Sequence, residues 1–91
     1  MKGLEREIKA LANKRRLAII EYLNKSKEST VGDIAENIKL SFKATSKHLS
    51  VLYAADIVEK EQRSLEMWYR LSSGLTGVAK FVANHISNSR E

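Results

Sequence analysis

Two helix-like segments only two residues apart constrain the fold of this chain more than any other feature. The first, 31–38, repeats apolar residues at helical spacing, and Thr30 with Asp33 forms a capping-box-like start. After a two-residue connection, Ser41 is a good N-cap for a second helix that continues through 42–54. Two short helices joined by so short a turn form a helix-turn-helix pattern.

The second of these helices has two faces of different character. Its apolar face is predicted to be buried and contains Thr45, Leu49, Leu52 and Tyr53. Its outer face combines short hydroxyls with long cations and holds no carboxylate: Lys43, Ser46, Lys47 and Ser50. A helix that only needs solubility normally mixes both signs of charge, whereas this face suits phosphates and base edges. The alternative, a solvated face that happens to be basic, stays open on this stretch alone.

The overall charge of the chain favours binding to nucleic acid over a merely solvated basic face. The 91 residues include 16 Lys+Arg against 11 Asp+Glu, a formal net charge of +5, which favours nucleic acid as a partner and an anionic membrane surface second. Cysteine is absent, which excludes disulfides, thiolate metal sites and cysteine nucleophiles. Because no apolar run is long enough for a signal peptide or a membrane span, we expect a soluble, cytoplasmic chain.

Two amphipathic helices are predicted before the helix-turn-helix pattern. Leu4, Ile8 and Leu11 form a helical stripe, and Asn13 is a good N-cap for a helix over 14–24. The first turn of that helix is crowded with cations, which oppose the helix dipole: Lys14, Arg15 and Arg16. A phosphate partner and a solvated basic turn both explain this cluster. The polar residues 25–29 are predicted to form a loop.

After Asp56, which tolerates the left-handed backbone that ends a helix, the periodicity changes to two. The pattern predicts strands over 57–61 and 66–71, joined by a hairpin tip at 62–65 that lacks the usual glycine. A final helix over 75–86 carries an apolar stripe with Phe81 beside it. We therefore expect one domain over 1–91, mainly α with a small β-hairpin: a winged helix-turn-helix with a further helix at each end.

Three blocks of this chain resemble the ArsR-type family of transcriptional repressors. They are ALANKRRLAIIEYL at 10–23, VGDIAE at 31–36 followed by SKHL at 46–49, and IV at 57–58 with WYRL at 68–71. Together the blocks cover nearly the whole chain in the order and spacing of the family. The resemblance implies a homodimer, formed mostly through the first and last helices, that lays its recognition helices in successive major grooves.

By position, the resemblance places the start of the recognition helix on DNA and the wing tip near an adjacent minor groove or phosphate. Arg16 joins this set from the basic turn, and His48 matches a family histidine that contacts phosphate or packs. The expected DNA-binding residues are Arg16, Ser41, Phe42, Lys43, Ser46, Lys47, His48, Arg63 and Ser64. The expected dimer interface, more apolar surface than one small winged helix needs, is Leu4, Ile8, Leu75, Val78, Val82 and Ile86.

The chain departs from the family pattern at several positions. Phe42 stands where glutamine is frequent, so its ring either touches a thymine methyl or covers the helix start. Lys39 replaces a turn glycine, at a cost of roughly 1 kcal/mol if its backbone is left-handed. Acidic residues in the wing oppose phosphate binding there: Glu59, Glu61 and Glu66.

No metal or other cofactor is expected. The family's metal sensing needs cysteines near the third helix or Asp/His clusters on the last one, and here only His85 remains, beside Asn84, Asn88 and Glu91. An enzyme is not expected either, because the two histidines lie on separate helices and no Gly-rich phosphate loop occurs. We expect a homodimeric transcriptional regulator, most simply a repressor, that binds double-stranded DNA. The alternative is a winged-helix protein-interaction module that does not read DNA.

Overall fold

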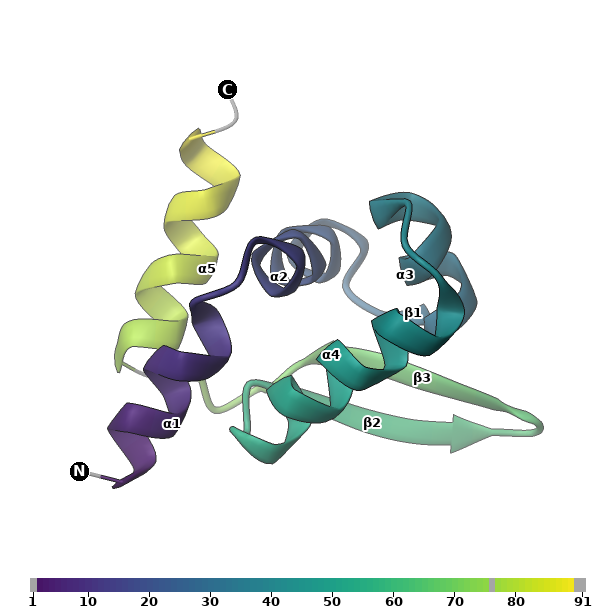
Figure 1. The fold of residues 1–91 in the computed structure, drawn as a ribbon, viewed down its shortest axis with the longest axis horizontal. Helices are drawn as coiled ribbons and strands as arrows, with labels where there is room; N and C mark the ends of the chain where they lie inside the picture. Colours follow the sequence, from purple (N-terminus) through teal and green to yellow (C-terminus); the bar gives the residue numbers. More distant parts are fainter. Residues whose placement is uncertain (1, 76, 90–91) are drawn as a thin grey trace.

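The computed structural model describes residues 2–75 and 77–89, with helices at both ends of the domain and a small sheet that projects from one side (Figure 1). The predicted order of helices is confirmed. The elements are α1 (Lys2–Leu11), α2 (Lys14–Ser26), β1 (Ser29–Thr30), α3 (Val31–Ile38), α4 (Phe42–Ala54), β2 (Val58–Arg63), β3 (Glu66–Leu71) and α5 (Gly77–Ser89). The last helix begins at Gly77 rather than at Leu75 as predicted, and Gly77 itself has a positive φ of 59°.

Side-chain N-caps stabilise the first turns of three helices, as predicted. The side-chain oxygen of Asn13 accepts hydrogen bonds from the backbone N–H groups of Arg15 and Arg16, at 2.8 and 3.1 Å. Thr30 and Ser41 do the same for α3 and α4, each accepting from the N–H three residues further on, at 3.2 and 3.1 Å. These acceptors satisfy N–H groups that have no partner inside the helix.

The turns adopt the left-handed backbone that the sequence suggested. Lys39 ends α3 with φ 58° and ψ 52°, and its N–H donates to the carbonyls of Ala35 and Glu36. Asp56, after α4, has φ 61°. Both positions hold a side chain where glycine would be unstrained, so each costs free energy that glycine would not.

The sheet has three strands rather than the predicted two, in the order β1-β3-β2 and antiparallel throughout. The prediction of a loop over 25–29 was wrong at both ends: α2 continues through Lys25 to Ser26, and Ser29 and Thr30 pair with Tyr69 and Trp68. The second strand is longer than predicted and continues to Arg63, which pairs with Glu66. The hairpin tip is therefore a two-residue loop, in which Ser64 takes the left-handed φ of 59° in place of the missing glycine.

The core lies where α2, α3 and α4 meet each other and the base of the sheet. Its largest fully buried apolar side chains are Ile19, Ile20, Leu23, Ile34, Leu49, Leu52, Ile57 and Val58. The prediction that Tyr53 faces this core was wrong: it is 45% exposed, and the Lys60 ammonium lies 4.3 Å from the centre of its ring. The edge of α4 that carries Tyr53 thus faces β2 and solvent.

The first and last helices lie side by side on the side of the domain opposite the wing (Figure 1). A carboxylate oxygen of Glu7 in α1 accepts from the backbone N–H of Ala79 at 3.0 Å, in the first turn of α5, where a negative charge is favoured. None of the described helices is long and apolar enough to cross a membrane.

Candidate nucleic-acid interface

The outer face of α4 presents cations without carboxylate partners. Lys43, Lys47 and Ser50 are exposed and Ser46 is half-buried, while Phe42–Ala54 contains no Asp or Glu. No ion pair to either lysine occurs among the described residues. The face therefore offers two free ammonium groups and hydroxyl groups side by side along one helix.

The start of α4 adds an aromatic ring to this surface. Phe42 is 62% exposed, so most of its ring is open to solvent. It lines a shallow pocket of ≈ 410 Å³ together with Leu65 of the hairpin tip and Met67 of β3. Ser41, also exposed, uses its oxygen to cap the helix, and its O–H group keeps its donor.

Two of the predicted DNA-binding residues contact each other instead of lying free. The Arg16 guanidinium donates to the carbonyls of Ala10 and Lys9, at 2.5 and 3.2 Å, and lies 3.3 Å from Nδ1 of His48. Burial, followed by the charges of Arg16 and Arg15, holds the pKa of His48 below its ordinary value. Arg16 thus fastens α1 and α4 to the first turn of α2.

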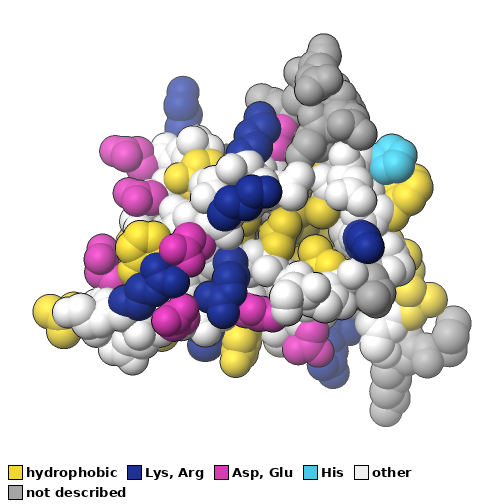
Figure 2. Space-filling view, turned by 180° about the vertical axis from the view of Figure 1, so that it is seen from behind, with side chains coloured by type: hydrophobic (Ala, Val, Ile, Leu, Met, Phe, Trp, Pro, Cys, Tyr) yellow, Lys and Arg dark blue, Asp and Glu magenta, His cyan; other side chains and the backbone are white. Residues whose placement is uncertain are grey.

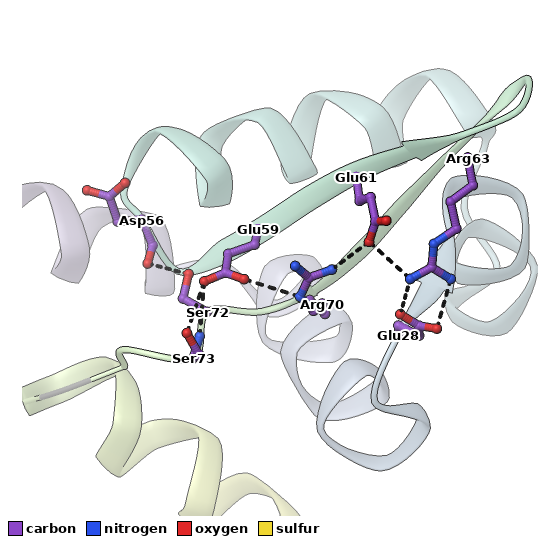
Figure 3. A network of polar contacts seen from close by, with 8 residues as sticks. All are labelled: Glu28, Asp56, Glu59, Glu61, Arg63, Arg70, Ser72 and Ser73. Carbon is purple, nitrogen blue, oxygen red and sulfur yellow. Dashed lines mark hydrogen bonds and ion pairs between the residues drawn. The ribbon is translucent and has the colours of Figure 1, made fainter.

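The wing contrasts with α4, because both of its arginines, Arg63 and Arg70, are paired with carboxylates (Figure 3). Arg63 donates to both carboxylate oxygens of Glu28, at 2.9 and 2.8 Å, and to Glu61 at 3.1 Å. Arg70 donates to Glu59 and Glu61, each at 3.2 Å. Sequence reasoning missed Glu28, since nothing in a polar loop indicates which distant side chain it meets.

These pairs hold the pKa values of the carboxyls of Glu28 and Glu61 low, chiefly through the hydrogen bonds from Arg63, and they raise the pKa of Arg63. The Arg63 guanidinium also lies 4.8 Å from the centre of the Trp68 ring. Because successive strand residues face opposite ways and Lys60 faces α4, the network lies on the face of β2 turned away from α4. In Figure 2, Lys and Arg side chains there lie beside Asp and Glu side chains.

The predicted dimer surface divides into an exposed and a covered part. Leu4 and Ile8 of α1 are 42% and 47% exposed. Leu75, Val78 and Val82 are partly buried against the core of the same chain, and Ile86 is half-buried. The most exposed apolar side chain of α5 is Phe81, at 60%. The sequence prediction put Phe81 beside the apolar stripe and did not include it in the expected dimer interface. Its position on the helix was the only indication in the sequence that it is exposed.

His85 is stacked on Phe81, with ring centroids 3.9 Å apart, and its Nδ1 lies 3.1 Å from the carbonyl of the same residue. Within residues 2–75 and 77–89, no three His, Asp or Glu side chains group so as to hold a metal ion. Glu91, the other candidate near His85, lies outside the described residues.

Comparison with known proteins agrees with this geometry. Residues 13–60 match the family model of the arsR family of bacterial regulatory proteins. The chain is 38% identical over 66 residues to the nodulation protein NolR of Rhizobium meliloti, a match that covers 72% of this chain and 53% of that protein. The chain therefore spans about half the length of this curated relative.

Two solved structures share the fold over nearly the whole chain. HlyU from Vibrio cholerae superposes with a TM-score of 0.82 at 28% identity, covering 97% of this chain and 91% of HlyU. The homodimeric winged helix-turn-helix DNA-binding domain of Mb0332 from Mycobacterium bovis gives a TM-score of 0.82 at 29% identity, covering 99% and 81%. The winged helix-turn-helix prediction is confirmed, and the matches are to regulatory proteins rather than to enzymes. The chain belongs to the ArsR family of bacterial regulatory proteins.

Proposed function

We propose that this chain is a homodimeric DNA-binding transcriptional regulator that reads the major groove with α4. The observation that carries the proposal is the outer face of α4, where Lys43 and Lys47 are exposed without carboxylate partners among the described residues. Free ammonium groups beside hydroxyls supply phosphate contacts and base-edge contacts together. Family membership and the homodimeric DNA-binding domain of Mb0332 support the same assignment.

Within this proposal the roles of the predicted residues differ. Lys43 and Lys47 neutralise phosphates, and Ser46 reads base edges, while the exposed ring of Phe42 contacts a thymine methyl. Arg16 and His48 act through the position of α4, since they are bonded to each other and to the end of α1.

The wing contributes less than the resemblance implied. Arg63 reaches a phosphate only if it gives up Glu28 and Glu61, so Ser64 at the tip is the residue that approaches the flanking backbone or minor groove. Glu59, Glu61 and Glu66 keep the local charge of the wing from becoming strongly positive. Repression in the cytoplasm, without a metal or other cofactor, is the expected mode of action.

The dimer forms through α1 and α5. Exposed Leu4, Ile8 and Phe81 lie on two helices that already pack side by side, so a second copy covers them together. Two α4 helices would then lie about one DNA turn apart, roughly 34 Å, and would enter successive major grooves. Light scattering at tens of micromolar is expected to give twice the mass of 10.3 kDa. A Phe81→Asp variant should be monomeric, whereas Lys80→Asp, on the neighbouring exposed position, should not.

The function is tested by selecting bound fragments from the source genome and measuring their affinity by fluorescence anisotropy. Submicromolar binding at moderate salt to a small set of fragments, with two half-sites one helical turn apart, is the expected result. Weak binding of equal strength to every fragment would contradict sequence-specific regulation.

The alternative function, a protein-interaction module, predicts a different result for variants of α4. Charge reversal at Lys43 and Lys47 would then leave a physiological protein partner bound, because the contact would lie elsewhere on the domain. Loss of every co-purified partner on that reversal, together with loss of DNA, favours the DNA-binding assignment.

A further inference from the structure

Arg16 is the point at which three helices meet. It belongs to the first turn of α2, yet its guanidinium reaches the last carbonyls of α1 and the His48 ring of α4. Carbonyls at a helix end have no N–H partner within the helix, so Arg16 supplies donors that α1 itself lacks. The side chain therefore links the helix proposed to form the dimer with the helix proposed to read DNA.

One side-chain hydrogen bond joins α1 directly to α4: Arg6 donates to the carbonyl of Ala54 at 3.3 Å. A pocket of ≈ 460 Å³ adjoins these contacts, lined by Glu5, Arg6, Lys9, Ala10, Arg16 and Val51. Ala10 and Leu11 anchor the end of α1 in the core, whereas this space beside α4 is not filled by close apolar packing. The polar contacts of Arg6 and Arg16 therefore contribute to the angle between α1 and α4.

We propose that Arg16 is a positioning residue that sets the angle between α1 and α4 through His48, and that protonation of His48 releases this coupling. The inference rests on the proposed function, in which α1 fixes the dimer axis and α4 enters the groove. A small rotation between these helices changes the separation of the two α4 helices in the dimer, and that separation must match one turn of DNA.

The chemistry of the pair makes the coupling sensitive to protons. A guanidinium has only donors, so Nδ1 of His48 must accept, and the neutral ring then carries its proton on Nε2. An imidazolium has no acceptor and would also face the positive charge of Arg16. Protonation therefore ends the hydrogen bond and replaces it with repulsion.

The groups around His48 fix the pH range. Arg15 and Arg16 face it from α2, and burial adds to their effect, so the pKa of His48 lies below its ordinary value of 6.5. From α1, Arg6, Lys9 and Glu5 line the adjoining pocket, with Glu5 paired to Lys9 at 3.7 Å. The coupling is thus intact near neutral pH and is lost as the solution is acidified below 6.5.

The direction in which DNA affinity changes on acidification distinguishes this coupling from a simple charge effect. Adding a positive charge to a residue that touches phosphate strengthens DNA binding. Release of α4 from α1 weakens it, because the two recognition helices no longer hold the required spacing. Affinity should then fall with acidification, by up to about tenfold per His48, and about a hundredfold for the dimer, for each unit of difference in the pKa of His48 between DNA-bound and free protein.

The test compares DNA affinity at pH 7.5 and 5.5, on a genomic fragment that the wild-type dimer binds, for four variants. His48→Asn keeps an acceptor that does not titrate, so its affinities at pH 7.5 and 5.5 should be equal. His48→Leu and Arg16→Lys should bind weakly at both pH values while remaining dimeric by light scattering. His85→Gln, which changes the only other histidine, should behave as wild type.

A second measurement does not depend on DNA. In an NMR titration of the ring nitrogens, His48 should show the Nε2–H tautomer and a pKa below 6.5, and Arg16→Lys should change that pKa. Wild-type affinity that is constant or rises on acidification, or an Nδ1–H tautomer for His48, would overturn the coupling. If no genomic fragment binds at pH 7.5, the proposed function fails, and the NMR result alone decides whether Arg16 holds His48.

Discussion

The outer face of α4 and the wing carry the same kinds of cation but use them differently. On α4, Lys43 and Lys47 are exposed and no ion pair to them occurs among the described residues. On the wing, Arg63 and Arg70 are held by three carboxylates. A count of basic residues would favour the wing, which has Lys60, Arg63 and Arg70 against the two lysines of α4. Their partners show that both lysines of α4 have charge to offer a polyanion, whereas, among the described residues, the two arginines of the wing are held in ion pairs and only Lys60 is not.

The largest expected effect follows from removing the free charge. A Lys43→Ala, Lys47→Ala double variant deletes four phosphate contacts in a dimer, each worth about 0.9 in the slope of log affinity against log salt. At physiological salt this predicts a loss of about a thousandfold in affinity for all sequences. Fluorescence anisotropy on a selected fragment measures it, with Lys25→Ala, an exposed lysine of α2, as the matched control. A loss of only a few-fold would show that α4 is not the main phosphate-binding element.

The inner face of α4 gives a smaller effect, on stability. Thr45 is fully buried, and its hydroxyl has no hydrogen-bond partner among the described residues. Thr45→Val removes this unsatisfied group while keeping the shape, so we expect the free energy of unfolding to rise by about 1 kcal/mol. Denaturant titration measures the change, with Ser50→Ala on the exposed face expected to stay within about 0.5 kcal/mol of wild type. A decrease for Thr45→Val would mean that the hydroxyl is satisfied in solution.

The wing responds to acid in a direction that its ion pairs determine. The pKa values of Glu28 and Glu61 are lowered from 4.5 in the folded chain, so their contribution is fully present above that pH and is lost as pH falls below it. These side chains are exposed, which makes the contribution small. The melting temperature should fall between pH 5 and 3, and less steeply in Arg63→Ala. An equal fall in both proteins would assign the acid sensitivity to other carboxylates.

The smallest expected effect is that of the wing on DNA. Arg63→Ala removes a cation that is bound to Glu28 and Glu61, so the salt slope of DNA binding should not change. Glu28→Gln removes the carboxylate that holds Arg63 but keeps Arg63 itself. This variant should therefore bind DNA slightly more tightly than wild type. Weaker binding of Glu28→Gln would show that the pair positions the wing for DNA rather than withholding its charge.

Local features of the sequence predicted most of this molecule. Asn13, Thr30 and Ser41 each cap a helix through atoms two or three residues away, so their roles can be read from neighbours. The apolar periodicity also depends only on neighbouring residues, and it predicted the positions of the helices and the hairpin. The strand β1 escaped prediction because two residues have no period, and only pairing with β3 makes them a strand.

The candidate site was predicted less completely, since its contacts join distant parts of the chain. Arg63 and Glu28 are 35 residues apart, and Arg16 and His48 are 32 residues apart. Basic residues could be identified from the sequence, but which of them stay free depends on these long-range partners. The resemblance to the family implied DNA contacts for both Lys47 and Arg63, and the structure shows that only Arg63 is held in ion pairs among the described residues.

The salt dependence of DNA binding, measured for three proteins on one selected fragment, tests this distinction most directly. The slope of log affinity against log salt should be reduced by about four units in the Lys43→Ala, Lys47→Ala dimer and unchanged in Arg63→Ala, relative to wild type. The opposite pattern, a slope that falls with Arg63 and survives loss of both lysines, would contradict the account. It would assign phosphate binding to the wing.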